Sequence, residues 1–364
     1  MHGRLPALIL APARWRRFTA AFAGAALLLA AALYAFVVLL DPYGLRAAPG
    51  RTPGPIMDVN QRFMDPQIVR GGRYDAAAFG TSTIRLLDPQ RLSEAFGARF
   101  ANLGFNAGTP WEQTQIADLF LRHTPNAKAL IFGLDATWCE ADADADEKRL
   151  TPRAFPPWLY DADRLNDYPH LLNFRSLEIA GRVALNRLGL MGERVRADGH
   201  QVFTPPERRY DLSRAQWHIR RIGPHSPPPI DPPVRLSEAE RAAFRFPALA
   251  WLDGLLGRAP PGADAILAFM PVHVAAQPVP GSHAAAYEEE CKARVADIGE
   301  RRGATVVDFR RPSPVTTEDS NYWDALHYRA PIAERVVRAL REARDTRRDA
   351  PDGFYRVLAA PKGE

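Results

Sequence analysis

An apolar run near the N-terminus constrains the architecture of this chain more than any other feature. Residues Phe18–Leu40 contain no charged side chain. As a helix, this run is about 34 Å long, which is enough to cross a bilayer. Arg14, Arg16 and Arg17 precede it, together with Arg4. The positive-inside bias therefore places the N-terminus in the cytoplasm and the remainder of the chain outside it.

The same run also fits a cleaved signal peptide. It is long for that role, and the sequence DPYG follows it in place of a cleavage site between small residues. We therefore expect an uncleaved single-pass anchor. Either interpretation exports the rest of the chain from the cytoplasm.

The composition is that of an ordinary globular protein: 24% of the 364 residues are charged and 46% are hydrophobic. The net charge of +5 is spread along the chain without a basic stripe interleaved with aromatic residues, so we expect no nucleic-acid partner. No metal-ligand spacing is present, and no cofactor is expected. Cys139 and Cys291 could pair in an oxidising compartment. However, Cys291 shares an expected helical face with Tyr287, Val295 and Ile298, which favours an unpaired core cysteine.

The composition also divides the chain into segments. The stretch after the anchor is rich in Gly, Pro and Arg, which predicts a stalk, and a later stretch loses the rhythm of strands and helices, which predicts an insertion. The expected organisation is a basic cytoplasmic N-terminus (1–17), a transmembrane anchor (18–40), a stalk (41–70), a main domain (71–345) with an insertion at about 140–260, and a polar, loosely held tail (346–364).

The stretch Tyr74–Arg85 is expected to carry the functional serine. It reads as a short apolar strand, Ala76–Phe79, that stops at Gly80 and turns into a helix with Ser82 near its start. This layout places a hydroxyl at the carboxyl edge of a sheet, beside the free N–H groups of a helix N-terminus. A Gly-Thr-Ser sequence is also an ordinary helix cap, so this feature alone does not decide the function.

Strands and helices alternate on both sides of the insertion. This order predicts a parallel sheet covered by helices. Further strands are expected at 99–103, 129–133, 265–270 and 305–309, and helices from Thr109 onward and at 171–188, 284–302 and 331–344.

The loop before the last helix contains Asp324 and His327 in the spacing D-x-x-H. At this spacing the carboxylate can accept the Nδ1–H of the imidazole and leave the other nitrogen to take a proton from a hydroxyl. The alternative is a helix-capping Asp beside a surface His. The loop follows the last strand and Ser82 follows the first, so all three side chains are expected at the carboxyl edge of the sheet.

These residues resemble the SGNH, or GDSL-type, hydrolase family. Gly80-Thr81-Ser82 resembles the first block of the family, which makes Ser82 the nucleophile. The sequence NLGFNAG resembles the second block, in which a glycine lends its N–H to the oxyanion hole; Gly108 is the better match and Gly104 the alternative. Asp324 and His327 resemble the last block, as orienter and general base.

The resemblance covers about residues 74–136 and 265–340. It implies a three-layer, flavodoxin-like α/β fold and a serine esterase or O-acyltransferase of the bacterial cytoplasmic membrane, with a periplasmic domain. It also implies an acylated envelope glycan or another ester as substrate, O-acetyl being the expected acyl group, and a membrane-protein acyl donor as a possible partner. The alternative is a catalytically inactive relative that binds glycan or scaffolds a membrane assembly.

Two residues depart from the family pattern. Thr81 replaces the Asp of G-D-S, which the chemistry tolerates because the following hydroxyl carries the reaction. Asp135, in Gly133-Leu134-Asp135, replaces an Asn of the oxyanion hole, where an ionised carboxylate would repel the developing charge. Asp135 could be protonated, could pair with Arg85, or could mark a site that has lost activity.

Other residues near the expected site have two interpretations each. Arg85 could hold an anionic substrate group or pair with Asp88 or Asp135. His273 follows the fourth strand and could bind substrate or be structural. Trp323 and Tyr328, which flank the D-x-x-H motif, could stack on a sugar or pack in the core. Aromatic and basic residues of the insertion could form a lid over the site or an insertion packed for stability; they are Trp158, Tyr160, Phe174, Arg175, Trp217, Arg220 and Arg221.

Overall fold

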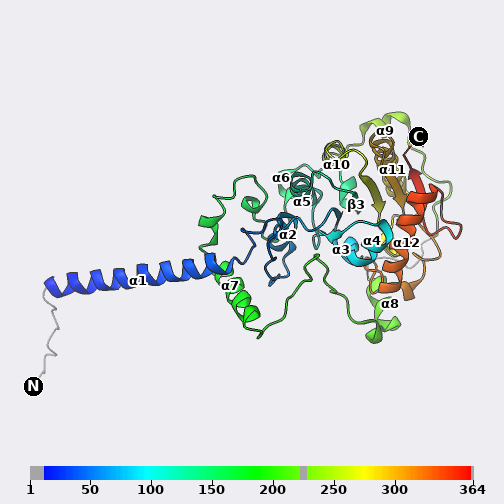
Figure 1. The fold of residues 1–364 in the computed structure, drawn as a ribbon. Helices are drawn as coiled ribbons and strands as arrows, with labels where there is room; N and C mark the ends of the chain where they lie inside the picture. The colour runs from blue at the N-terminus through cyan, green and yellow to red at the C-terminus, as the bar shows by residue number, and fades with distance from the viewer. Residues whose placement is uncertain (1–11, 222–227, 362–364) are drawn as a thin grey trace, which may run out of the picture.

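A computed structural model describes residues 12–221 and 228–361 of the chain. Three parts of the chain lie outside the described residues. They are residues 1–11, which include Arg4 and the start of the expected cytoplasmic segment, residues 222–227 of the insertion, and residues 362–364. The helix α1 (Pro12–Leu40) projects from the rest of the molecule (Figure 1). Its stretch Arg14–Leu40 is long and apolar enough to cross a membrane, as an anchor or as a signal sequence.

The core of the molecule is a six-stranded sheet in the order β2-β1-β3-β4-β5-β6. The first five strands in this order pair in parallel, and β6 pairs antiparallel with β5. The prediction of an α/β protein with a mostly parallel sheet is therefore confirmed. The strands are β1 (Ala76–Phe79), β2 (Phe100–Asn102), β3 (Ala129–Leu134), β4 (Asp264–Phe269), β5 (Thr305–Asp308) and β6 (Arg356–Ala359).

Helices cover both faces of this sheet (Figure 1). One face packs against α5 (Pro110–His123), α10 (Ala248–Leu256) and α11 (His283–Arg302), and the other against α4 (Pro89–Phe96) and α12 (Ala330–Thr346). Each helix carries an apolar stripe toward the strands, so the sheet is buried on both sides and its strands are almost entirely apolar.

The helix α5 begins at the position that the sequence predicts, with a capping box. The Thr109 side chain accepts the Glu112 N–H at 3.1 Å, and the Glu112 carboxylate accepts the Thr109 N–H at 3.1 Å. Two of the N–H groups that a helix start leaves without partners are thereby satisfied.

The insertion between β3 and β4 consists of short helices joined by irregular loops. The segment predicted at 171–188 forms α7 (Phe174–Arg187), whereas α10 packs on the sheet like the helices of the main domain. The remaining helices of the insertion are α6 (Asp146–Arg149), α8 (Leu212–Arg220) and α9 (Glu238–Ala243). The 3-10 helices of the chain are η1 (Ala136–Cys139), η2 (Pro157–Leu159), η3 (Tyr168–Leu171), η4 (Glu207–Arg209), η5 (Val274–Ala276) and η6 (Asp319–Asn321).

The prediction of a stalk at 41–70 is wrong. All ten residues of α2 (Gln61–Arg70) are buried, and Tyr43 is fully buried against Phe63 and Trp158. A buried ion pair joins Arg62 of α2 to Glu112 of α5, with Nε 2.9 Å from the carboxylate. The glycines and prolines of this segment shape turns between apolar residues that pack in the core, so their number did not indicate an extended linker.

The prediction of a loosely held tail is also wrong. Residues 356–359 form β6, and the preceding Phe354 and Tyr355 are 2% exposed and pack on Phe309. A few aromatic and aliphatic residues in a polar segment are enough to add an antiparallel edge strand, because a single edge strand needs only one partner.

Candidate active site

The serine lies at the turn from β1 into the short helix α3 (Ser82–Arg85). Gly80 makes this turn with φ +154°, and a Cβ atom there would lie 2.8 Å from the carbonyl oxygen of Gly133 on β3. Only glycine therefore allows the two strands to approach so closely. As a result, Ser82 stands half-buried at the carboxyl edge of the sheet.

The structure brings Ser82, His327 and Asp324 together in one hydrogen-bonded chain. The Oγ atom of Ser82 lies 2.8 Å from Nε2 of His327. Nδ1 of the same imidazole lies 2.8 Å and 3.0 Å from the two carboxylate oxygens of Asp324. This is the geometry in which a carboxylate fixes the imidazole so that its far nitrogen can accept the serine proton.

Asp324 is held as an ionised acceptor. Besides His327 Nδ1, its Oδ1 accepts the N–H groups of Leu326 at 2.8 Å and His327 at 2.9 Å. Burial by itself would raise the pKa of Asp324, but the His327 hydrogen bond and charge together with these N–H groups bring that pKa below its usual value.

The loop that carries Asp324 and His327 is tied directly to the serine helix. The hydroxyl of buried Tyr328 donates to the carbonyl of Thr83 at 2.6 Å. Within the loop, the N–H of Trp323 donates to the carbonyl of His327 at 2.8 Å. Tyr328 therefore packs in the core, as one of its two interpretations expected, and sets the distance between the two halves of the site.

His273 is hydrogen-bonded to the loop that carries Asp324 and His327. It is fully buried, its N–H donates to the carbonyl of Ala325 at 2.9 Å, and its Nε2 lies 3.1 Å from a carboxylate oxygen of Asp319. Its Nδ1 accepts the N–H of Ala275, so Nε2 carries the proton toward Asp319. The structure thus places His273 beneath the site, and its ring does not reach the surface where substrate would bind.

The expected oxyanion donors are occupied in this structure. The Gly108 N–H donates to the carbonyl of Phe105 at 3.2 Å, and the Gly104 N–H donates to the side chain of Asn102 at 3.1 Å. No hydrogen bond from the Ser82 N–H to another described residue is present. Of the groups expected in the oxyanion hole, only the Ser82 N–H is therefore ready to receive an oxyanion without a change in the loop at 104–109.

Asp135 caps η1 and does not pair with Arg85. Its carboxylate accepts the N–H of Thr137 at 3.0 Å, together with the hydroxyls of Thr137 and Thr81. Burial raises the pKa of Asp135, although these hydroxyl and N–H donors oppose that rise. The two positions that depart from the family pattern, 81 and 135, are therefore in contact with each other.

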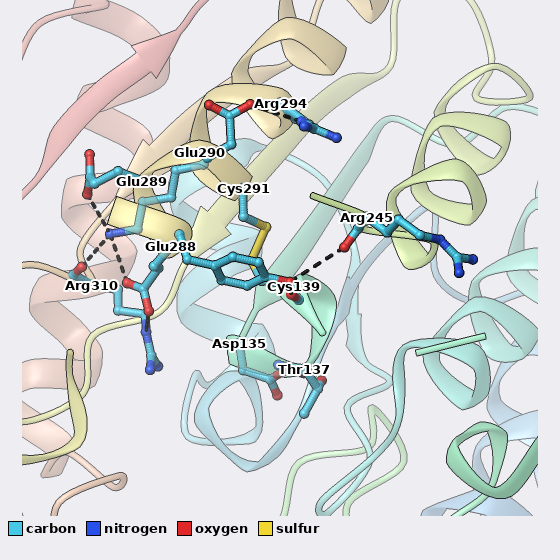
Figure 2. Close-up of a disulfide and its surroundings, with 12 residues drawn as sticks. Asp135, Thr137, Cys139, Arg245, Glu288, Glu289, Glu290, Cys291, Arg294 and Arg310 are labelled. Atoms are coloured by element: carbon cyan, nitrogen blue, oxygen red, sulfur yellow. Dashed lines mark hydrogen bonds and ion pairs between the residues drawn. A yellow bond between two sulfur atoms is a disulfide. The ribbon is translucent and has the colours of Figure 1, made fainter. Parts of the chain in front are cut away.

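A disulfide joins Cys139, at the end of η1, to Cys291 on α11 (Figure 2). The prediction of an unpaired core cysteine is wrong for Cys291, although its burial and its place on the inner face of α11 are as expected. The helical face does not exclude a disulfide, because a buried cysteine can meet a partner from a neighbouring loop. The bond fixes η1, and with it the turn that contains Asp135, to the helix layer.

Arg85 faces a residue of the insertion that the sequence did not single out. Its guanidinium lies over the ring of Phe203, 4.8 Å from the ring centre, and donates to the Gln201 side chain at 2.7 Å. Phe203 also meets the ring of His327 edge to face, with centres 5.6 Å apart. Phe203 therefore forms a wall of the site. No hydrophobic periodicity in residues 199–233 predicts this role for Phe203.

A buried carboxyl, Asp65 of α2, shares the electrostatic environment of Arg85. Burial lowers the pKa of Arg85, and the Asp65 charge opposes this change. Burial likewise raises the pKa of Asp65 well above its usual value, against the charges of Arg85 and Arg62. No sequence pattern indicated Asp65, because it lies in the segment expected to be a stalk.

A cavity of about 220 Å³ opens beside Arg85. Charged, polar and small apolar side chains from the α3–α4 region, the segment at 200–204 and α12 line it. They include Arg85, Asp88, Arg91, His200, Thr204 and Glu334. The mixed charges suit a polar ligand better than a lipid chain.

Other expected contact residues lie at the edge of the site or away from it. Trp323 is half-buried, and its ring meets that of Tyr210 edge to face at 5.2 Å. Of the insertion residues expected in a lid, Trp158 packs on Tyr43, and Phe174 is the first residue of α7, which contacts α1. The segment that reaches the triad is therefore 201–204.

Comparisons with known proteins leave the family of this chain open. A scan against protein-family models finds no match, and no curated protein matches the sequence.

Proposed function

We propose that this protein is a serine-dependent acyl-transfer enzyme, an esterase or O-acyltransferase similar to the SGNH hydrolases. The observation that carries the proposal is the continuous chain from Ser82 Oγ to His327 Nε2 at 2.8 Å and from His327 Nδ1 to Asp324 at 2.8 Å. A serine at a helix start and a surface histidine rarely align by accident in this way, with a carboxylate on the far nitrogen.

In the proposed reaction, Nε2 of His327 takes the hydroxyl proton of Ser82 as Oγ bonds to the acyl carbonyl carbon. The Ser82 N–H receives the oxyanion. The intermediate collapses as His327 returns the proton to the departing alcohol oxygen, which leaves the acyl group on Ser82. Water or a glycan hydroxyl then attacks the acyl carbon and gives its proton to His327. The new acid or ester departs, and Ser82 regains its proton.

The fold supports this proposal. The parallel strands follow the order 2-1-3-4-5 of flavodoxin-like sheets, in which ligands bind at the carboxyl ends of the strands near the point where the order reverses. Ser82 follows β1, which lies at that point, and His327 follows β5. The order of motifs along the chain is also that expected for an SGNH-like protein.

The proposed substrate is an acylated glycan, or another ester, of the cell envelope. The helix α1 supports a single-pass protein of the bacterial cytoplasmic membrane with its domain outside, and the disulfide supports an oxidising compartment such as the periplasm. Arg85 and the mixed charges of the adjacent cavity support a polar substrate. In the transferase variant of this proposal, a membrane protein supplies the acyl group.

The test is covalent labelling with a fluorophosphonate probe. The full chain in detergent is treated with the probe, and the adduct is located by mass spectrometry. We expect the label on Ser82, no label in the Ser82→Ala variant, and full labelling of a control variant, Ser213→Ala, which alters an exposed serine of α8. Labelling of several serines in proportion to exposure would contradict an activated Ser82.

A second candidate function is a non-catalytic glycan-binding or scaffolding protein. It is favoured by Asp135, which stands where an oxyanion donor is expected, and by the engagement of the Gly108 N–H with Phe105. A folded sample that takes up no probe, yet binds acetylated glycans in a pull-down, would support this candidate over the enzyme.

A further inference from the structure

The outer end of α1 is packed against the domain. The hydroxyl of Tyr34 donates to the carbonyl of Tyr168 in η3 at 3.1 Å, and Val37 is 3% exposed. Val38 and Leu40 also pack on the core that contains these residues. The last two turns of α1 therefore do not stand free, and η3 and α7 lie beside them (Figure 1).

Two arginines mark the end of the apolar helix. Arg46 donates to the carbonyl of Leu39 at 2.8 Å, and Arg187 donates to the carbonyl of Leu40 at 3.3 Å. Both side chains belong to exposed residues. Guanidinium groups satisfy the free carbonyls of a helix end and prefer the headgroup region to hydrocarbon. They place the outer boundary of the hydrocarbon at about Leu40.

The length of α1 leads to the same boundary. The freely projecting apolar part, Phe18–Leu33, is 16 residues long, or about 24 Å, whereas the hydrocarbon core of a bilayer is about 30 Å thick. Moving the span toward the N-terminus would draw Arg14, Arg16 and Arg17 into the hydrocarbon, which charged side chains disfavour. A span of about 30 Å needs about 20 residues, so one that begins after Arg17 extends at least to about Val37, which places Tyr34 within the apolar zone.

The segments that pack on 34–40 must then reach membrane depth as well. Tyr34 lies six residues, or about 9 Å, inward from Leu40 along the helix. Tyr168 is hydrogen-bonded to it and so sits at a similar depth. Interfacial helices bury their apolar faces by about 5–10 Å, so this depth is one that a surface element of a protein can occupy.

These segments expose several large apolar side chains, beside charged residues such as Glu178 and Arg187. Phe174, at the start of α7, is 82% exposed, and Leu165 before η3 is 80% exposed. On α7, Phe174 and Leu185 share one helical face, with Leu188 continuing it past the helix end. The large exposed apolar residues of this region are Leu165, Leu172, Phe174, Leu185, Leu188 and Leu190.

We propose that residues 165–190 form a second membrane contact, in which these apolar side chains enter the outer leaflet of the lipid bilayer beside α1. The inference rests on α1 being the anchor of the proposed function. The contact restricts rotation of the domain about the anchor, so that the domain is held at one height and in one orientation over the membrane surface.

The experiment measures the depth of a fluorophore in lipid. Phe174→Cys and Leu188→Cys variants of the full chain are labelled with an NBD dye and placed in phosphatidylcholine–phosphatidylglycerol vesicles that contain doxyl-labelled lipid. Both native cysteines are in the disulfide, so the introduced thiol is the one available for labelling. Leu29→Cys serves as the reference within the span, and Leu212→Cys on distant α8 serves as the exposed control.

We expect doxyl lipid to quench the labels at 174 and 188 at least threefold more strongly than the label at 212. Quenching at 29 but only control-level quenching at 174 and 188 would overturn the second contact and leave the anchor intact. Control-level quenching at all four positions would overturn the anchor and this proposal together. A blue-shifted emission at 174 without quenching would assign the surface to a protein partner and also overturn it. Labelling of Ser82 by the fluorophosphonate probe reports on the catalytic proposal separately.

Discussion

Ser82 and His327 lie 245 residues apart in the sequence, yet Oγ of Ser82 is 2.8 Å from Nε2 of His327. Asp324 contributes most to this order, because it accepts the imidazole and two N–H groups of its own loop. It thereby holds His327 in the tautomer whose Nε2 can take the proton of Ser82.

Asp324→Asn is expected to slow the reaction of Ser82 with the fluorophosphonate probe by about 10³–10⁴-fold, since the amide favours the wrong imidazole tautomer. The second-order rate constant of labelling measures this effect. Asp211→Asn, which alters an exposed helix cap on α8, is the control and should react at the normal rate. A loss of less than tenfold would contradict the role of Asp324 as orienter.

The same substitution has a consequence for stability against pH. Because the pKa of Asp324 is lowered on folding, its ionised form adds stability above the unfolded-state value of about 3.9, and this stability is lost as the pH falls through the lower folded-state value. We expect Asp324→Asn to lose less stability than the unsubstituted protein between pH 5 and pH 2. Urea unfolding across this range measures the difference.

Replacing Asp135 with asparagine is expected to speed the labelling of Ser82, whereas the same replacement of Asp324 slows it. Asparagine can also cap η1 by accepting the Thr137 N–H, and it removes a carboxylate from the region of the developing oxyanion. Asp135→Asn should therefore raise the rate of Ser82 labelling by about tenfold while leaving the urea midpoint close to that of the unsubstituted protein. A slower reaction with unchanged stability would show that the carboxylate assists the chemistry.

Sequence alone could predict the alignment of the triad but not the surroundings of the serine. Ser82 and His327 follow strands whose order fixes their meeting at one edge, and Asp324 is local to His327. Phe203 comes from an irregular loop, so no pattern predicts that it meets His327. The state of the Gly108 N–H depends on the fold of its loop, in which Ala107 adopts a positive φ of 50°.

At the scale of elements, the disulfide is the main link between the site and the helix layer. Cys139 ends the 3-10 turn that begins beside Asp135, and Cys291 lies on α11, 152 residues later (Figure 2). Closing so long a loop restricts the unfolded chain strongly. The pattern on α11 could show that Cys291 faces inward, but its partner depends on how η1 packs.

Replacing both cysteines with alanine is expected to lower the free energy of unfolding by about 2–5 kcal/mol. Urea unfolding of the full chain in detergent measures the change. Dithiothreitol treatment of the unsubstituted protein should reproduce it, and should leave the stability of the variant unchanged. Equal stability of the oxidised, reduced and substituted proteins would contradict a stabilising disulfide.

The wrong predictions of a stalk at 41–70 and of a loosely held tail at 346–364 share a physical cause. The segments 41–70 and 346–364 contain too few regularly spaced apolar residues to show a period, yet each supplies large side chains to an existing core. Tyr43 and Tyr355 are each no more than 2% exposed. An edge strand such as β6, or a single aromatic residue that packs in the core, needs the rest of the fold to bury it. The local sequence pattern therefore does not predict it.

At the scale of the whole molecule, the domain begins at the end of α1, without a spacer. Tyr43 bonds to Ser176 of α7 at 3.1 Å, and Leu45 is also buried. The chain therefore passes from α1 directly into the core. A domain separated from α1 must therefore keep the buried residues Tyr43 and Leu45.

A chain that starts at Thr52 should be several kcal/mol less stable than one that starts at Asp41, because it lacks Tyr43 and Leu45, and the loss of one large core side chain alone costs about 2–5 kcal/mol. Thermal unfolding of the two soluble proteins measures the difference. Addition of a Leu45→Ala variant of the longer protein separates the contribution of one residue. Equal melting temperatures would contradict a packed segment at 41–51.

The disulfide also gives the covalent structure the topology of a ring with two arms. The ring runs from Cys139 to Cys291 and encloses the whole insertion; Ser82 lies on one arm, with α1, and His327 on the other. A protease that cuts the exposed loops of the insertion once therefore opens the ring without separating the arms. The two halves of the site stay covalently joined to each other and to α1 until a reductant is present.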